Sequence, residues 1–202
     1  MLQDVLMFIK NQLDQFLVNT FELDEGVAVL NHLMQQDGSF PEKNKNKMVL
    51  TLINLDYETN KACSNSRRRL ADQSFVSINS PVLFNVNLLF TSSFEDYEES
   101  LKFLNSTIAF FQARPYFNQN NTPGMPKEIK AIYFDIENSS FFETHNLWSA
   151  MGAKYQPSII YKIRHVTIQG GEIEGITPVV RESDIKVLPQ GKVIDVNREA
   201  DV

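Results

Sequence analysis

Residues 81–91 read PVLFNVNLLFT, a nearly continuous apolar stretch that only Asn85 and Asn87 interrupt. Its length is that of a strand, and the proline at its start and the serines after it are typical of strand boundaries. A strand that is apolar along its whole length is buried on both faces. Residues 80–91 therefore predict the central strand of a sheet.

Three other stretches have the composition of strands. Residues 48–57 and 158–169 are rich in branched and aromatic side chains, and residues 130–136 carry alternate apolar side chains on one face. Together with residues 80–91 they predict an α/β fold. Its sheet is mixed, mainly antiparallel and covered by helices.

Two helices are predicted, one before the strand at residues 48–57 and one after the strand at residues 80–91. Residues 2–17 repeat apolar side chains at three-and-four spacing, which predicts an amphipathic helix packed on the sheet. Ser92 and Glu95 have the spacing of a capping box, which predicts the start of a second helix. Arg114 and Pro115 end that helix, because proline cannot continue it.

A third, short helix is predicted after residues 130–136. Ser140 and Glu143 form another capping-box pattern, and Gly152 can end the helix in the left-handed conformation. The helix carries Trp148, the only tryptophan of the chain. Core packing and an interface anchor are both open for this side chain.

Residues 58–73 are polar and have no core-facing period, which predicts a long exposed loop. The loop contains Arg67, Arg68 and Arg69, whose guanidinium groups can bind carboxylates or phosphate. In an acidic protein, an acidic protein partner is the first expectation. A solvated hairpin tip is the second, and nucleic acid is the last.

From residue 170 onward, glycines and prolines interrupt the chain and helical periodicity is absent. We therefore predict an α/β domain of residues 1–169 and an extended C-terminal arm of residues 170–202. Branched clusters at 176–180 and 185–188 could add strands to a neighbour rather than to their own sheet.

Charge and cysteine content exclude several classes of function. The chain has 19 basic and 25 acidic side chains and a formal net charge of −6, so its surface repels nucleic acid. The single cysteine, Cys63, can form no internal disulfide and suits folding in a reducing compartment. Charged residues interrupt the apolar N-terminal stretch before a signal peptide or a membrane span could form. No membrane partner is expected.

No residue pattern points to catalysis. His32, His145 and His165 have no partner at metal-ligand spacing, and neither a Gly-x-Ser-x-Gly elbow nor a phosphate-binding Walker pattern occurs. The sequence therefore predicts a protein that is not an enzyme and needs no cofactor or metal. An uncharacterised hydrolase is a rival hypothesis, which requires a buried His or Cys with a perturbed pKa in a cleft.

Five blocks of the sequence carry a family resemblance. Residues 88–101 read LLFTSSFEDYEESL, and residues 146–155 read NLWSAMGAKY, an unusual string before a strand that opens with proline. Residues 108–112, the loop up to Pro126 and residues 157–164 complete the set. In these blocks the chain resembles the cap-protein family of antifeeding-prophage and virulence-cassette particles.

This resemblance covers about residues 80–166 and implies a tail-terminator-like fold with a structural role. It implies a homo-oligomer, a hexameric ring that closes the inner tube and the contractile sheath at the end distal from the baseplate. The tube protein and the sheath protein are then its partners. Such a particle is assembled in the bacterial cytoplasm and is then released. Another structural connector of the particle is the alternative.

The block at residues 146–155 supplies further candidates for partner contact: Trp148, Lys154 and Tyr155. Some members of the family carry an additional C-terminal domain. The sequence given stops after a short arm, so the resemblance does not carry the role of such a domain over to it.

Overall fold

The computed structural model describes residues 2–58, 66–69, 75–78, 82–126, 129, 131–168, 173–177, 186–187 and 193–194. The chain divides into two compact units, Met1–Ala62 with Pro81–Gln169, and Cys63–Ser80 with Gly170–Val202. Within the described residues, the first unit holds a six-stranded sheet and three α-helices. The second holds a three-stranded and a two-stranded sheet.

The six-stranded sheet has the order β1-β2-β5-β8-β7-β6. Its strands are β1 (Ala28–Leu30), β2 (Lys47–Tyr57), β5 (Val82–Ser93), β6 (Tyr116–Asn118), β7 (Ala131–Ile136) and β8 (Ser158–Ile168). β1 pairs with β2 in parallel, and the other pairs are antiparallel. The predicted mixed, mainly antiparallel sheet is confirmed. The four predicted strands are its four inner members, while the short edge strands β1 and β6 were not predicted.

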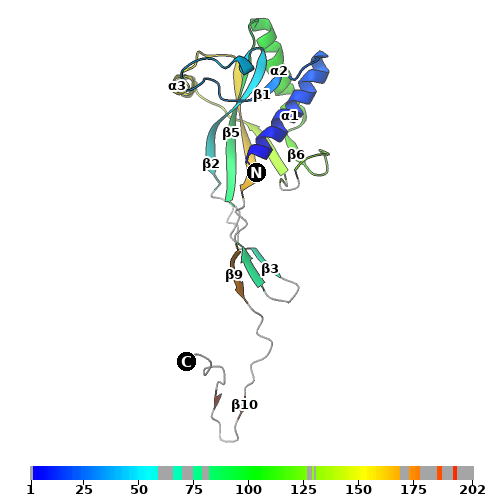
Figure 1. The fold of residues 1–202 in the computed structure, drawn as a ribbon, viewed down its shortest axis with the longest axis vertical. Helices are drawn as coiled ribbons and strands as arrows, with labels where there is room; N and C mark the ends of the chain where they lie inside the picture. The colour runs from blue at the N-terminus through cyan, green and yellow to red at the C-terminus, as the bar shows by residue number, and fades with distance from the viewer. Residues whose placement is uncertain are drawn as a thin grey trace. The chain divides into compact units, whose positions relative to one another are not determined.

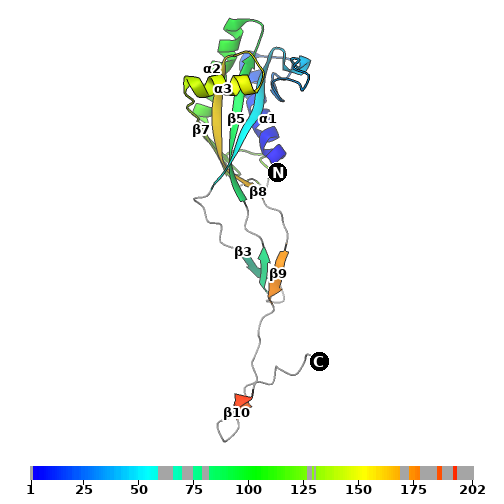
Figure 2. The same ribbon diagram turned by 90° about the vertical axis from the view of Figure 1, so that its left-hand side faces the viewer.

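Helices cover the sheet on both sides (Figure 1 and Figure 2). α1 (Leu2–Phe21) and α2 (Tyr97–Ala113) pack together on one face, and α3 (Phe141–Ala150) lies on the other. A 3-10 turn, η1 (Glu42–Asn44), precedes β2. The predicted helices are therefore present, and the predicted α/β fold is confirmed.

The predicted start of α2 is wrong. Ser92 belongs to β5, and its Oγ donates a hydrogen bond to Ser100 O at 2.7 Å. Asp96 is the N-cap instead, because its Oδ1 accepts from Glu98 N at 2.7 Å and from Glu99 N at 3.1 Å. The pairing of β5 with β2 extends through Ser92 and Ser93, which delays the helix by one turn.

Alternate side chains of β5 enter two separate cores. Leu88 and Phe90 are fully buried on the side of α1 and α2, where the ring of Phe90 contacts Phe111 at a centroid distance of 5.2 Å. Leu89 is buried on the opposite side, beneath α3. A strand places successive side chains on opposite faces, so an apolar run is what a two-sided sheet requires.

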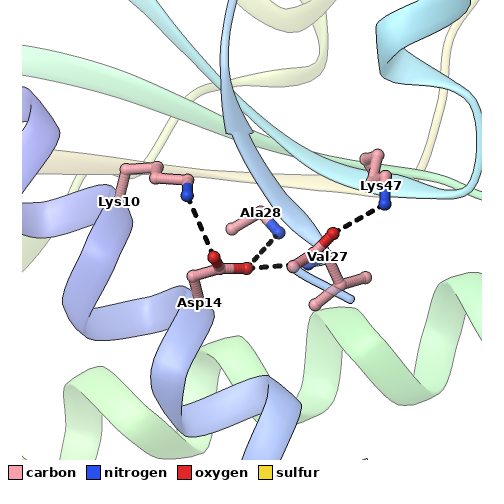
Figure 3. Close-up of polar contacts among 6 residues, drawn as sticks. Lys10, Asp14, Val27, Ala28 and Lys47 are labelled. Atoms are coloured by element: carbon pink, nitrogen blue, oxygen red, sulfur yellow. Dashed lines mark hydrogen bonds and ion pairs between the residues drawn. The ribbon is translucent and has the colours of Figure 1, made fainter. Parts of the chain in front are cut away.

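A carboxylate fastens α1 to the edge strand β1 (Figure 3). Asp14 Oδ1 accepts hydrogen bonds from Val27 N and Ala28 N, both at 2.7 Å, and Oδ2 accepts from Lys10 Nζ at 2.9 Å. A Cβ on Gly26 would lie 2.8 Å from Asp14 Oδ2, so a side chain at that position would displace the carboxylate. Burial raises the pKa of Asp14, but the hydrogen bonds and the Lys10 charge outweigh it and hold the pKa below 3.8.

We expect Asp14→Ala to lower the free energy of unfolding by about 1–3 kcal/mol, because two backbone N–H groups lose their acceptor. Asp24→Ala is the matched control, since Asp24 is exposed. The folded pKa of Asp14 lies below the unfolded value, so its contribution is complete above pH 3.8 and is lost as the pH falls further. Urea denaturation at pH 7 and near pH 3 measures both effects. Equal stabilities of the two variants at pH 7 would contradict the assignment.

In the second unit, β3 (Ser66–Arg69), β4 (Phe75–Ile78) and β9 (Ile173–Thr177) form an antiparallel sheet. β10 (Lys186–Val187) pairs with β11 (Val193–Ile194). The predicted loop is therefore wrong at Ser66–Arg69, where pairing with β4 makes a strand without any apolar period. Glu58 lies in neither a helix nor a strand, and residues 59–65 and 70–73 are outside the described residues.

The predicted use of the arm is partly wrong as well. Ile176 pairs with Val76, and Thr177 pairs with Phe75, so this cluster completes a sheet of its own chain. The residues that follow Thr177 in that cluster are outside the described residues. The division into residues 1–169 and 170–202 stays a prediction.

Candidate partner-contact surface

Both ends of α3 are held by local hydrogen bonds. Ser140 Oγ accepts from Glu143 N at 3.3 Å, and Glu143 Oε2 accepts from Ser140 N at 2.7 Å, which confirms the predicted capping box. The hydrogen bond from Ser140 N lowers the pKa of Glu143. Gly152 has a φ of +65°, which confirms the left-handed ending. Ala153 N then donates to Trp148 O at 3.2 Å.

The inner face of α3 rests on the sheet through Trp148. This side chain is only 4% exposed and packs with Leu33, Val49 and Leu89. Leu147, Met151, Ala153 and Ile160 surround this cluster. The helix is therefore anchored to β2 and β5 by one large aromatic side chain, and its orientation is fixed.

The outer side of the same helix exposes aromatic rings. Phe141 is 92% exposed and Phe142 is 72% exposed, and Tyr155, just beyond the helix, is 67% exposed. We refer to these three residues as the α3 aromatic surface. The Tyr155 ring contacts Trp148 edge to face at a centroid distance of 5.4 Å, so the surface is continuous with the anchor.

A hollow of about 640 Å³ lies on this surface. It is lined by Ser139, Phe141, Thr144, His145, Trp148, Ser149, Ala153 and Tyr155. Its walls are mostly apolar, with hydroxyl groups and one imidazole among them. Such a hollow can receive a bulky side chain of a partner protein, and aromatic side chains carry much of the binding energy in protein interfaces.

Beyond α3 the same face of the sheet is polar. Asn87 and Lys162 share this face with the side chains beneath α3, because side chains alternate along a strand. Lys162 Nζ lies 3.5 Å from Asp56 Oδ2, which also accepts from Asn87 Nδ2 at 3.2 Å. Arg164 Nε lies 2.6 Å from Asp135 Oδ2. An apolar patch beside a polar, charge-balanced area has the composition of an interface with its rim.

The predicted contact residues fall into two groups. Trp148 and Tyr155 touch each other, and Lys154 is exposed beside them. Arg67, Arg68 and Arg69 lie on β3 in the second unit, where the structure describes their backbone pairing with β4. A role in partner contact stays a prediction for all six residues.

Phe141 and Phe142 were not among the predicted contact residues. A signal was present, because these two phenylalanines directly follow the N-cap Ser140. Adjacent positions of a helix point in directions about 100° apart, so a short helix with one core-facing stripe cannot bury both.

The described residues hold no candidate metal centre. In that part of the chain, no group of three or more His, Cys, Asp or Glu side chains could hold a metal ion. His32 and His145 are exposed, and Cys63 lies outside the described residues. None of the described helices is long and apolar enough to cross a membrane.

Two substitutions distinguish the contribution of the buried Trp148 to stability from that of an exposed ring. We expect Trp148→Ala to lower the free energy of unfolding by about 3–5 kcal/mol, because it empties a filled core position. Phe142→Ser should change it by less than about 0.5 kcal/mol, because the ring is already in water. Chemical denaturation of both variants measures this difference. A mild effect of Trp148→Ala would mean that α3 is held by other contacts.

Most of the sequence matches the model of one protein family. The family model described as the Pvc16 N-terminal domain matches residues 4–182. No curated protein matches the sequence.

Solved structures share the fold, among them the following two. One is the PVC sheath/tube terminator of an extracellular contractile injection system in the extended state, with a TM-score of 0.61 and 14% identity over 93% of this chain and 64% of that chain. The other is the tube-terminating cap of the anti-feeding prophage, with a TM-score of 0.55 and 16% identity over 87% of this chain and 59% of that chain. This chain therefore spans less than two thirds of the length of either.

Proposed function

The chain belongs to the Pvc16 N-terminal domain family, and on this ground we propose that it is a structural cap of a contractile injection particle. In this role it closes the end of the inner tube and of the contractile sheath. The two similar structures, a sheath/tube terminator and a tube-terminating cap, support this role through their shared fold. A cap acts by geometry and binding, so the role requires neither a catalytic group nor a cofactor.

The proposed contact with partner proteins rests on the α3 aromatic surface. Water-exposed Phe141 and Phe142 stand on a helix that Trp148 and the capping box hold rigid. A rigid aromatic surface loses little conformational entropy when a partner covers it, and each ring removes a large apolar area from water. We assign this surface to contact with another protein of the particle.

The assembly around this surface follows from the cap role. The proposed partners are further copies of this chain in a hexameric ring, the inner tube protein and the sheath protein, without nucleic acid or membrane. A closed ring needs two different, complementary surfaces on each subunit, so the α3 aromatic surface would supply one of them. Assembly takes place in the bacterial cytoplasm, and the ring is later part of an extracellular particle.

Phe141→Ser combined with Phe142→Ser tests the contact surface. We expect co-sedimentation with assembled tube and sheath to fall at least tenfold, which is about the effect of losing one aromatic hot spot. The melting temperature should stay that of the wild type. Tyr97→Ser combined with Leu101→Ser is the matched control, because these side chains are 66% and 44% exposed on α2.

The comparison of the two double variants decides the assignment. Equal binding of the α3 double variant and the wild type to tube and sheath would show that the α3 aromatic surface is not part of the interface. Light scattering of each protein, alone and with tube, shows whether ring formation or tube docking is the step that is lost.

Charge reversal tests the second candidate contact. Replacing Arg67, Arg68 and Arg69 by glutamate should weaken docking to the particle, and the loss should be largest at low salt, because salt screens charge pairs. The wild-type salt dependence of docking is the reference. Docking that is unchanged at low and moderate salt would show that this triplet contributes nothing to the contact.

A further inference from the structure

The outer edge strand β6 is a natural place for another strand to add, since its free side could pair with an extended segment. Phe134 N donates to Pro115 O at 2.8 Å across the β6–β7 pair. Backbone N–H and C=O groups alternate in direction along a strand. Those of Pro115 and Phe117 therefore point toward β7, and those of Tyr116 and Asn118 point toward the open side. Two N–H and two C=O groups therefore face outward.

Three of these four groups already have partners from the same chain. Asn121 Oδ1 accepts from Asn118 N at 2.8 Å, and Asn121 Nδ2 donates to Tyr116 O at 3.1 Å. Thr122 N donates to Asn118 O at 3.1 Å. The side-chain amide of Asn121 presents one acceptor and one donor, the same pair that the backbone of an added strand would present. It lies where that strand would lie.

The Asn121 side chain is itself held in place. Asn118 Oδ1 accepts from Asn120 N and Asn121 N, both at 2.9 Å, and Thr122 Oγ1 donates to Asn121 Oδ1 at 2.8 Å. Asn118 and Asn121 thus bind each other's backbone reciprocally.

The opposite edge of the sheet shows a similar arrangement. Met48 N donates to Val27 O at 2.8 Å, so the carbonyl group of Val27 points toward β2. The backbone groups of Ala28 therefore point away from β2. Ala28 N donates to Asp14 Oδ1 at 2.7 Å, as Figure 3 shows. A side chain on α1 therefore takes the first outward donor of β1.

We propose that Asn121 and Asp14 stand in for a neighbouring strand at the two edges, and that they close the six-stranded sheet to strand addition. A second copy of this chain, or an extended segment of another protein, then cannot continue this sheet. Partners that contact the unit with this sheet must then bind through side-chain surfaces such as the α3 aromatic surface. The inference rests on the hydrogen bonds at the two edges and is independent of the cap role.

Asn121→Ala in the full chain tests this proposal, with Asn120→Ala as the matched control. Amide hydrogen exchange at low concentration should be at least tenfold faster at Asn118 N–H in Asn121→Ala, which is about the factor that one net hydrogen bond supplies. At high concentration sedimentation velocity should detect species larger than those of the wild type. The Asn118 amide should then be protected again, because a second β6 strand occupies the vacated edge.

Two results would overturn the proposal. One is an Asn118 amide that exchanges without protection in the wild type. The other is a folded Asn121→Ala protein whose association state matches the Asn120→Ala control at every concentration. Should Asn121→Ala fail to fold, Asn121→Ser is judged by the same two readouts, because its shorter side chain stays polar but cannot reach both Asn118 N and Tyr116 O.

Discussion

The burial of β5 on both faces is the constraint on which the rest of the structure depends. Leu88 and Phe90 need a cover on one side of the sheet, and Leu89 needs a cover on the other. Burying one large apolar side chain contributes about 1.5–3 kcal/mol relative to leaving it in water. Neither face can be left open without losing several such contributions, so the fold requires helices on both sides. α1 and α2 supply the first cover, and α3 supplies the second.

The two covers have different consequences for function. α1 and α2 bury an extensive aromatic cluster and complete the core. α3 is short and covers the other face of the sheet through Trp148. Phe141 and Phe142 on this helix and Tyr155 just beyond it are exposed to solvent. The same helix therefore closes the smaller core and presents the surface that we propose for partner contact. The proposed closure of the edges of the six-stranded sheet makes that surface more important, because it leaves side chains as the means of contact for this sheet.

The sequence predicts the parts of this fold that local chemistry decides. Ser140, Glu143 and Gly152 are within a few residues of the groups they bind, so both ends of α3 could be predicted. Strands β1 and β6 have three residues each, and their pairing depends on segments distant in the sequence. No periodicity can develop over three residues. The contacts of Asp14 with Val27 and Ala28 also join distant segments. The contacts of Asn121 are local and were missed because residues 116–126 were predicted only as a loop.

The candidate surface was predicted in part. The resemblance directed attention to the block that contains Trp148 and Tyr155, and these two residues do meet. Phe141 and Phe142 lie outside that block, and exposure of a side chain is a property of the packed structure rather than of a sequence pattern. The basic triplet was assigned to a loop because polar strands carry no apolar period, although β4 pairs with it.

The length of tubes and sheaths in particles from cells that lack this protein tests the central claim most directly. A cap ends polymer growth, so electron microscopy of such particles should show tubes and sheaths of irregular length with unclosed ends. Particles of normal, uniform length that lack only an attached component would contradict a terminating role and would indicate a connector instead.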